Sequence, residues 1–254
     1  MGKNNMNSGL ITEAAELIKD SSRTTAFTGA GISVESGVPP FRGEGGLWEN
    51  YDPIVLDIGY FNSNPEESWR VIKEIFYDFF VDVKPNRAHY VLAEMEKMGF
   101  LQSVITQNID NLHYDAGSGE VYEYHGNSRN LICTGCGRKE SSKEISLEEL
   151  PPLCPECSSV LKPDFVFFGE PIPAEENRKS WMEVENSDLF IVMGTSGEIM
   201  PASMIPYEAK KGGKKIIEVN VAPSNYTHKI TDIFLEGKAS VVMDELLKEI
   251  KTLD

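Results

Sequence analysis

The chain has 254 residues, of which 41% are hydrophobic and 25% are charged. These are the proportions of an ordinary globular protein, and the length suits one large domain or one domain that carries a smaller module. Lys and Arg number 24 against 40 Asp and Glu, so the net charge is −16. Wholesale disorder is excluded and direct nucleic-acid binding is disfavoured. The charge would attract cationic partners such as lysine-rich protein segments, although solubility alone explains it more simply.

No apolar run reaches the ~18 residues of a membrane span. The opening MGKNNMNSG has neither the apolar region nor the cleavage site of a signal peptide. Met6 stands where an N-myristoylation signal takes Ser or Thr. We therefore expect a cytoplasmic protein with no membrane partner.

The expected elements alternate between helices and strands along the chain. A helix is expected over residues 12–20, with Thr12 as its N-cap, and a strand over 23–28 runs into glycines. Further strands are expected at 103–106, 121–124, 188–193 and 215–219, and further helices at 87–98, 110–116 and 203–211. This alternation predicts an α/β fold with a doubly wound parallel sheet.

Two segments interrupt the alternation. Residues 43–85 are rich in aromatic side chains and are expected to form a helical excursion, whereas residues 131–162 hold every cysteine of the chain. We interpret the two as parts of one smaller inserted module. The larger domain then comprises residues 1–42, 86–130 and 163–254.

The cysteines form two C-x-x-C pairs, Cys133 with Cys136 and Cys154 with Cys157, and 17 residues lie between the pairs. This spacing places four thiolates around one tetrahedral Zn²⁺, which is expected to be structural because no coordination position is left for water. Two disulfides or redox-active pairs are the alternative, which a reducing compartment disfavours. A nucleic-acid-binding zinc ribbon is disfavoured because acidic residues outnumber basic ones between the cysteines.

A glycine-rich loop, Gly29-Ala30-Gly31-Ile32-Ser33, follows the first expected strand. Glycines at the end of a strand let backbone amides approach a phosphate. The loop lacks the G-x-G-x-x-G spacing of the usual dinucleotide fingerprint, so a tight structural turn explains the loop alone equally well.

Polar or small residues also follow the other expected strands, namely Gln107, Asn108, Asp110, His125, Gly194, Thr195, Ser196 and Asn220. A helix cap or an ordinary polar loop explains any one of these strand ends. A shared crevice at the carboxyl edge of the sheet explains all of them. A lone histidine is more often structural, but His125 at such a strand end is expected to act as a general base.

With these residues considered together, the sequence closely resembles the sirtuin family of NAD-dependent protein lysine deacylases from about Thr12 to Leu247. The resemblance rests on an ordered set of motifs: Gly29-Ala30-Gly31-Ile32-Ser33, Phe41-Arg42-Gly43, Gln107-Asn108-Ile109-Asp110, His125-Gly126, the four cysteines, Val166-Phe167-Phe168-Gly169-Glu170, Gly194-Thr195-Ser196 and Asn220. It implies a Rossmann-like NAD domain with a smaller zinc-binding and helical module, and an acyl-lysine tunnel between them. In the family's reaction the acyl oxygen attacks C1′ of the nicotinamide ribose as nicotinamide leaves, and a ribose hydroxyl then attacks the alkylimidate. The implied products are lysine, nicotinamide and 2′-O-acyl-ADP-ribose.

The resemblance also implies roles for single residues. His125 would help to deprotonate the ribose hydroxyl and Asn108 would position the ribose or a water, so these two are the expected catalytic residues. The expected cofactor-binding residues are Gly29, Ala30, Gly31, Ser33, Phe41, Arg42, Gln107, Ile109, Asp110, Gly194, Thr195, Ser196, Asn220 and Ala239. The expected substrate contacts are Val166, Phe168, Gly169 and Glu198, with the backbone of residues 168–170 pairing with an extended peptide.

Departures from the family pattern bear on specificity. Pro40 stands where many relatives have Asp or Thr, and residues 197–201 replace a more apolar stretch. In that stretch Glu198 would favour substrates with nearby Lys or Arg, unless it is merely solvated. Relatives that remove succinyl or malonyl groups carry a Tyr-x-x-Arg pair, whereas the matching positions are Ile72 and Ile75. An anionic acyl group would lose its arginine partner, so acetyl or longer neutral acyl groups are the expected substrates.

The residues leave two other functions open. A mono-ADP-ribosyltransferase would use the same cofactor site with a different nucleophile, and a non-enzymatic NAD-binding or zinc-ribbon interaction protein would need no catalytic residues. Asn108 and His125 favour a deacylase over the first, and His125 and Asp110 speak against the second.

Overall fold

The computed structural model describes residues 2–41, 45–78 and 82–253. Its centre is a six-stranded sheet with the order β3-β2-β1-β7-β8-β9, in which every neighbouring pair is parallel. The strands are β1 (Thr24–Thr28), β2 (Ser103–Thr106), β3 (Val121–Glu123), β7 (Leu189–Met193), β8 (Lys215–Asn220) and β9 (Ile233–Glu236). The predicted α/β fold with a parallel, doubly wound sheet is confirmed.

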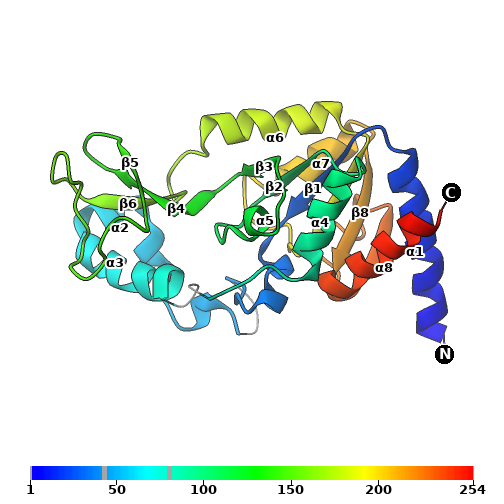
Figure 1. Cartoon of the computed structure of the whole chain (residues 1–254), viewed down its shortest axis with the longest axis horizontal. Helices are drawn as coiled ribbons and strands as arrows, with labels where there is room; N and C mark the ends of the chain where they lie inside the picture. Colours follow the sequence, from blue (N-terminus) through cyan, green and yellow to red (C-terminus); the bar gives the residue numbers. More distant parts are fainter. Residues whose placement is uncertain (1, 42–44, 79–81, 254) are drawn as a thin grey trace.

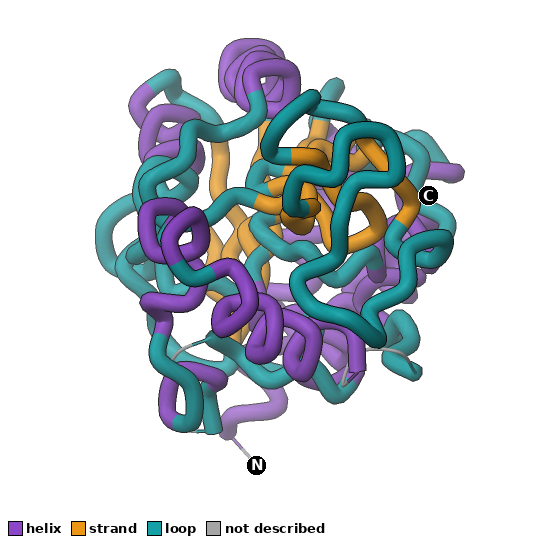
Figure 2. The backbone as a smooth tube through the Cα atoms, turned by 90° about the vertical axis from the view of Figure 1, so that its left-hand side faces the viewer, coloured by secondary structure: helices purple, strands orange, loops and turns teal. Residues whose placement is uncertain are grey.

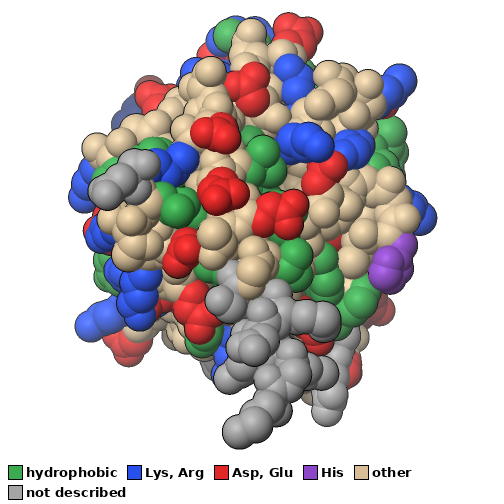
Figure 3. All heavy atoms as spheres, turned by 90° about the vertical axis from the view of Figure 1, so that its right-hand side faces the viewer, with side chains coloured by type: hydrophobic (Ala, Val, Ile, Leu, Met, Phe, Trp, Pro, Cys, Tyr) green, Lys and Arg blue, Asp and Glu red, His purple; other side chains and the backbone are tan. Residues whose placement is uncertain are grey.

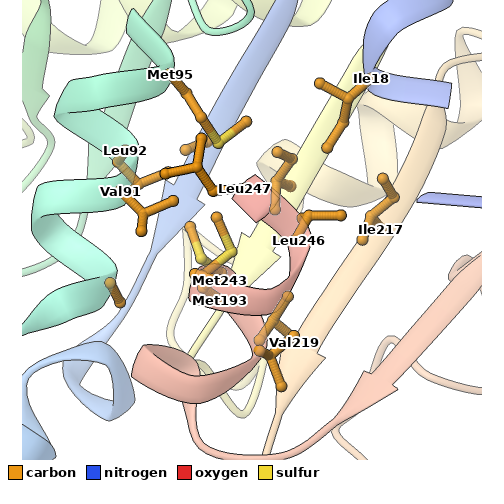
Figure 4. Close-up of a cluster of buried hydrophobic side chains, with 14 of the residues drawn as sticks. Ile18, Val91, Leu92, Met95, Met193, Ile217, Val219, Met243, Leu246 and Leu247 are labelled. Atoms are coloured by element: carbon orange, nitrogen blue, oxygen red, sulfur yellow. The ribbon is translucent and has the colours of Figure 1, made fainter. Parts of the chain in front are cut away.

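Helices cover both faces of this sheet (Figure 1). One layer holds α1 (Gly2–Asp20), α4 (Arg87–Lys97) and α8 (Ala239–Thr252), and the opposite layer holds α6 (Ala174–Asn186) and α7 (Met204–Lys211). Figure 4 shows how side chains of the first layer, among them Ile18, Leu92 and Leu246, meet Met193 and Ile217 of the sheet. The sheet is therefore the middle of three layers.

The central strands are buried on both faces, because successive side chains point to opposite layers. In β1, Ala26 packs into the core beneath α1, α4 and α8, whereas Phe27 packs into the core beneath α6 and α7. In β7, Ile191 packs beneath α1, α4 and α8, and Phe190 packs beneath α6 and α7. This double burial explains why such strands are apolar runs in the sequence.

A smaller module lies at the opposite end of the molecule from α1 and α8, and Figure 2 views the molecule from that end. It contains an antiparallel sheet of order β5-β4-β6, formed by β4 (Gly126–Cys133), β5 (Lys139–Ser141) and β6 (Leu161–Phe165). Helices α2 (Ile58–Ser63) and α3 (Pro65–Lys73) and a π-helical turn (Glu74–Asp78) belong to the same module. Phe61 and Trp69 share one hydrophobic core with Leu131 and Phe165, so the helical and cysteine-containing segments form a single inserted module.

The remaining described elements are short. They are α5 (Leu112–Asp115) and 3-10 helices at Ala30–Ile32, Val34–Ser36, Leu47–Glu49 and Pro53–Leu56. No described helix combines the length and the apolar character that crossing a membrane requires. The end of the molecule formed by α1 and α8 carries side chains of both charge signs rather than a patch of one sign (Figure 3).

Two expected helices differ from the structure. The first begins at Gly2, so Thr12 lies inside it and is not an N-cap. The Thr12 hydroxyl instead donates to Glu249 Oε1 (2.7 Å) and joins α1 to α8. The helix expected over residues 110–116 is reduced to α5, because Asn111 adopts a left-handed backbone conformation with φ of 68°.

Candidate active site

The site lies between β1 and β7, where the strand order of the central sheet reverses. Ligands of doubly wound sheets bind at such a reversal, beyond the carboxyl ends of the strands. There, Gly29 N donates to Met193 O (3.0 Å) and Gly31 N donates to Gly194 O (2.8 Å). A Cβ atom on Gly31 would lie 2.6 Å from Gly194 Cα, and Gly194 has a φ of 60°. The glycines therefore let the two loops touch, and the amides of Gly29 and Gly31 are occupied by this contact rather than free for a phosphate.

A cavity of about 480 Å³ opens at this crevice. Its volume falls within the roughly 300–1,000 Å³ of small-molecule and cofactor sites. The predicted residues that line it are Gly29, Ala30, Gly31, Phe41, Gln107, Asn108, Ile109, His125, Val166, Phe168, Gly169, Gly194, Thr195, Ser196 and Asn220. The ends of β1, β2, β3, β7 and β8 thus share one crevice with a segment that follows β6.

His125 stands between β3 and β4 and lines the cavity. Its Nδ1 lies 3.0 Å from Gln107 O. Because a carbonyl oxygen can only accept, Nδ1 carries the proton and Nε2 of the neutral ring keeps its lone pair. Burial lowers the pKa of His125 below the ordinary 6.5, and the hydrogen bond to Gln107 partly opposes this shift. The ring is therefore neutral near pH 7 and can accept a proton at Nε2.

A buried hydrogen-bond network connects the loops after β1 and β2. Asn108 Nδ2 donates to Gly29 O and to Ser33 Oγ, each at 3.2 Å, and Ser33 Oγ donates to Asp110 Oδ2 (2.6 Å). The Leu112 amide donates to the other carboxylate oxygen of Asp110 (3.0 Å). Burial raises the pKa of Asp110, while its bonds to Ser33 and Leu112 oppose the shift. The network fixes the position of Asn108 at the cavity wall.

Three predicted side chains also order the loop after β7. Gln107 Nε2 donates to Thr195 Oγ1 (3.3 Å), and Asn220 Nδ2 donates to Thr195 O (3.1 Å). The same Thr195 hydroxyl accepts from Gly197 N (3.2 Å). Loops that follow β2, β7 and β8 are thereby held as one surface.

The opposite wall of the cavity belongs to the segment after β6. Val166 N donates to His125 O (2.8 Å), which ties this wall to the histidine. Phe168 N donates to Leu56 O (2.8 Å) and Phe168 O accepts from Ile58 N (3.1 Å). Both backbone groups of Phe168 are therefore already paired within the chain, so the pairing of residues 168–170 with a peptide stays a prediction that falls on Gly169 and Glu170. The Phe168 side chain remains available, since it is 44% exposed.

Some predicted residues do not line the cavity. Ser33 is fully buried behind Asn108, Glu198 is exposed to solvent, and Ala239 is buried at the start of α8. Asp110 borders a separate void of about 10 Å³, the volume of about one water probe, together with Ala30, Val38, Pro39, Phe41, Leu47, Asn108 and Ile109. Arg42 lies outside the described residues.

Sequence reasoning missed part of the lining. The missed residues are Trp48, Leu56, Phe165, Ile172, Ala222, Pro223 and Ser224. The family motifs and the departures from them already pointed to the other lining residues, namely Pro40, Phe167, Glu170, Ile199, Met200 and Pro201. Residues 222–224 follow β8 and could have been found by extending the strand-end argument past Asn220. Trp48 and Leu56 reach the cavity from the small module, and no local pattern marks them.

The four cysteines lie together in the small module. The Sγ atoms of Cys133 and Cys157 are 3.4 Å apart, those of Cys136 and Cys154 are 3.8 Å apart, and all four lie within 4.8 Å of one another. The thiols are free, and their sulfurs are farther apart than the ~2.05 Å of a disulfide. Tetrahedral Zn²⁺ with bonds of about 2.3 Å separates its sulfur ligands by about 3.8 Å. The donor set thus fits a structural zinc with four protein ligands.

Comparison with known proteins gives a consistent result. A model of the Sir2 family matches residues 29–201. The chain is 44% identical to an NAD-dependent protein deacylase of Pyrococcus abyssi, with 96% of this chain and 99% of that protein covered. It is 43% identical to NAD-dependent protein deacetylase 1 of Pyrobaculum aerophilum, with 95% of each chain covered.

Solved structures agree with these relatives. A structure from a study of the mechanism and regulation of Sir2 enzymes superimposes with a TM-score of 0.88 at 42% identity, covering 97% of this chain and 99% of the other. A complex of Sir2 with a p53 peptide and NAD⁺ gives a TM-score of 0.86 at 35% identity, covering 93% of this chain and 97% of the other. The chain therefore belongs to the Sir2 family of NAD-dependent protein deacylases.

Proposed function

We propose that the protein removes acetyl and longer neutral acyl groups from lysine side chains, consuming NAD and forming lysine, nicotinamide and 2′-O-acyl-ADP-ribose. One observation carries the neutral-acyl part of this proposal. Within the described residues, the cavity wall contains Glu170 but no lysine or arginine. An anionic acyl group would be desolvated there without a cationic partner, whereas a neutral one would meet mainly apolar surface.

NAD fits the half of the cavity built from strand ends. The small and polar residues at the ends of β1, β2, β7 and β8 suit phosphates and ribose hydroxyls. In the described part of the loop after β1, the Ala30 amide has no backbone hydrogen-bond partner, and we assign it to the diphosphate. Gln107 and Asn220, which order the neighbouring loop through Thr195, would hold the ribose groups.

His125 is proposed as the general base. Its Nδ1 proton is committed to Gln107 O, so Nε2 is the atom that would take a proton from a ribose hydroxyl. The lowered pKa keeps this nitrogen unprotonated at neutral pH. A base positioned in this way contributes typically about 10²–10⁴-fold to the rate.

Asn108 and Asp110 are proposed to orient the reacting end of NAD. Asn108 is fixed by its bonds to Gly29 O and Ser33, and it lines both the main cavity and the small void. Asp110 borders the small void, where its carboxyl group would bind the nicotinamide carboxamide. Ser33 would act only through these two residues. Such orientation is the main demand of a reaction in which charge develops at C1′.

The acyl-lysine side chain is proposed to enter between Val166 and Phe168. Ile72 and Ile75, which replace the Tyr-x-x-Arg pair of succinyl-removing relatives, are 0% and 2% exposed in the core of the small module. Neither lines the cavity, so neither offers a polar group to an acyl chain. Acyl-lysine peptides are the proposed partners, and four free cysteine thiols fit the reducing cytoplasm.

The test compares acetyl-, butyryl- and succinyl-lysine versions of one peptide. We expect a higher kcat/KM for the neutral acyl groups, with equal amounts of nicotinamide and acyl-ADP-ribose detected by mass spectrometry. A higher kcat/KM for succinyl-lysine would refute the acyl preference. Nicotinamide release without acyl transfer, together with label from NAD on protein, would instead favour ADP-ribosyl transfer.

A further inference from the structure

A buried ion pair supports the acyl-lysine wall, with Glu170 in the wall and Lys162 behind it. Lys162 Nζ lies 3.0 Å from Glu170 Oε2, and the two side chains are 7% and 22% exposed. The ammonium group also donates to Pro163 O (2.9 Å) and Phe165 O (2.6 Å), and it stands 4.1 Å from the centre of the Phe167 ring. Its hydrogen-bonding capacity is thus used entirely within residues 162–170.

Glu170 binds both the Lys162 ammonium group and the backbone of the same segment. Its Oε2 accepts from Phe167 N (2.8 Å) as well as from Lys162. The pair therefore binds backbone groups of residues 163, 165 and 167, at the point where the chain leaves β6. Burial lowers the pKa of Lys162, and the adjacent Glu170 opposes the shift.

The segment held in this way forms the wall of the cavity. Phe165, Val166, Phe167, Phe168 and Gly169 all line it, and Glu170 lines it as well. Breaking a buried ion pair leaves an uncompensated charge, so the pair resists distortion of the chain that it binds. A displacement of this segment would change the surface that an acyl-lysine side chain meets, and would therefore weaken its binding.

We propose that the Lys162–Glu170 pair is a positioning element that sets the main chain of residues 165–170 for acyl-lysine binding. This inference rests on the proposed function, because it assigns the wall to acyl-lysine. The pair touches neither the strand-end loops nor the side chain of His125 in the contacts of the described residues. Its loss should therefore affect the acyl-lysine substrate more than NAD.

The decisive variant is Lys162→Met, which keeps an unbranched side chain only one atom shorter and removes its charge. We expect the KM for an acetyl-lysine peptide to rise about tenfold, while the KM for NAD and kcat change by less than about threefold. Lys162→Arg, which keeps the cation, should restore most of the peptide KM. Glu170→Gln should also raise the peptide KM, and Lys162→Met with Glu170→Gln should be no worse than Lys162→Met alone.

The matched control is Lys139→Met. Lys139 forms an ion pair with Asp164 (2.6 Å) in the same small module, but its side chain is 60% exposed. Exposed pairs of this kind contribute little. We therefore expect the peptide KM and the NAD KM of this variant to match those of the unaltered protein.

Binding of a fluorescent acetyl-lysine peptide, measured by anisotropy without NAD, provides a readout that does not depend on turnover. A higher peptide Kd in Lys162→Met, with rescue in Lys162→Arg, supports the proposal. An unchanged peptide Kd with only a lower Tm shows a purely structural role and overturns it, as does an equal rise in both KM values. If Lys162→Met does not fold, an unchanged peptide Kd in folded Glu170→Gln overturns it. Absence of acyl turnover in the unaltered protein would refute the proposed function instead.

Discussion

The two halves of the cavity are held together in different ways. The strand-end half, which follows β1, β2, β7 and β8, is joined by backbone hydrogen bonds such as Gly29 N to Met193 O and Gly194 N to Val219 O. The acyl-lysine half, residues 165–170, is joined to the rest of the small module by the backbone bonds of Phe168 to Leu56 and Ile58. Side chains hold it as well, namely the Lys162–Glu170 pair and the contact of Phe167 with Phe61 at 5.2 Å between ring centres. The first half depends on the topology of the sheet, and the second depends on the core of the small module.

This difference implies that the halves can be damaged separately. Loss of order in the small module should remove acyl-lysine binding while the strand ends still bind the adenosine part of NAD. His125 belongs to both halves, because its ring bonds to the backbone after β2 and its own backbone bonds to Val166. The predictions below test this separation, beginning with the change of largest expected effect.

Removal of zinc should abolish acyl-lysine binding. Cys133 and Cys154 belong to the core of the small module, so loss of a metal that contributes about 10 kcal/mol or more should unfold this module. We expect one zinc per chain by elemental analysis of the intact protein. In Cys154→Ala we expect no detectable deacylation but binding of ADP-ribose within about tenfold of normal, measured by calorimetry.

A matched Glu156→Gln variant changes an exposed side chain between Cys154 and Cys157 that is not a ligand, and it should keep its zinc and its activity. Full deacylation by a Cys154→Ala protein without zinc would contradict the separation of the two halves. Loss of ADP-ribose binding together with the zinc would also contradict it, because the strand-end half would then depend on the small module.

Replacement of His125 should affect the chemical step rather than either half. For His125→Ala we expect kcat to fall by about 10²–10⁴-fold, while peptide and ADP-ribose affinities stay within about threefold. In the unaltered protein, kcat should decline only below pH 6.5, because burial lowers the pKa of His125 and the base is active when neutral. Exposed His228 provides the control, since His228→Ala should leave both kcat and its pH profile unchanged. An acid limb above pH 6.5 would contradict the proposed environment of the base.

The fold of the strand-end half could be predicted because its signals are local. Strands buried on both faces are apolar runs, and β2 begins and ends at the predicted residues 103 and 106. β9 was missed although it is as long as β2, because only Ile233 and Leu235 of its four side chains are buried, whereas β3 at the other edge is buried throughout. α8 was also missed, although Val242, Met243, Leu246 and Ile250 have the spacing of a buried helical face.

The acyl-lysine half could be predicted only in part. Resemblance supplied Val166 and Phe168, but the pairing of the Phe168 backbone with Leu56 and Ile58 joins residues more than 100 positions apart, which no local pattern reports. The role of Lys162 was equally hidden, since a lysine in a strand is normally expected at the surface. The boundaries of the small module remain predictions from sequence.

Acid should weaken the core behind the strand-end half. Burial lowers the pKa of His89 to about 4 and also lowers that of His113, whereas both titrate near 6.5 when unfolded. The unfolded chain therefore binds more protons below pH 6.5, so stability falls as the pH drops from 6.5 toward 4. At pH 5 the lowered pKa of His89 alone reduces the free energy of unfolding by about 2 kcal/mol relative to neutral pH.

The measurement is the Tm of the unaltered protein and of His89→Gln at pH 7 and pH 5. His89→Gln should lose less stability between these pH values, by about 4–8 °C in Tm. Burial raises the pKa of Asp110 in the same cluster, so this group favours the folded state as the pH falls. Because Asp110 is present in both proteins, its effect cancels in the comparison. Equal losses of Tm in the two proteins would show that His89 does not remain neutral in the fold.

The smallest expected effect concerns Glu198, which is exposed and lies beside the cavity residues Ile199 and Met200. An exposed charge pair contributes about 0.2–1 kcal/mol, so Glu198→Gln should raise the KM for a lysine-flanked acetyl peptide by no more than about fivefold at low salt. The effect should vanish at high salt and for a peptide with uncharged flanks, because screening removes interactions between exposed charges. Glu185→Gln, the same change at an exposed position in α6 with no cavity residue beside it in the sequence, should leave all of these KM values unchanged. If Glu185→Gln and Glu198→Gln raise the KM equally, the attraction of basic peptides comes from the net charge of −16 and not from a residue at the cavity rim.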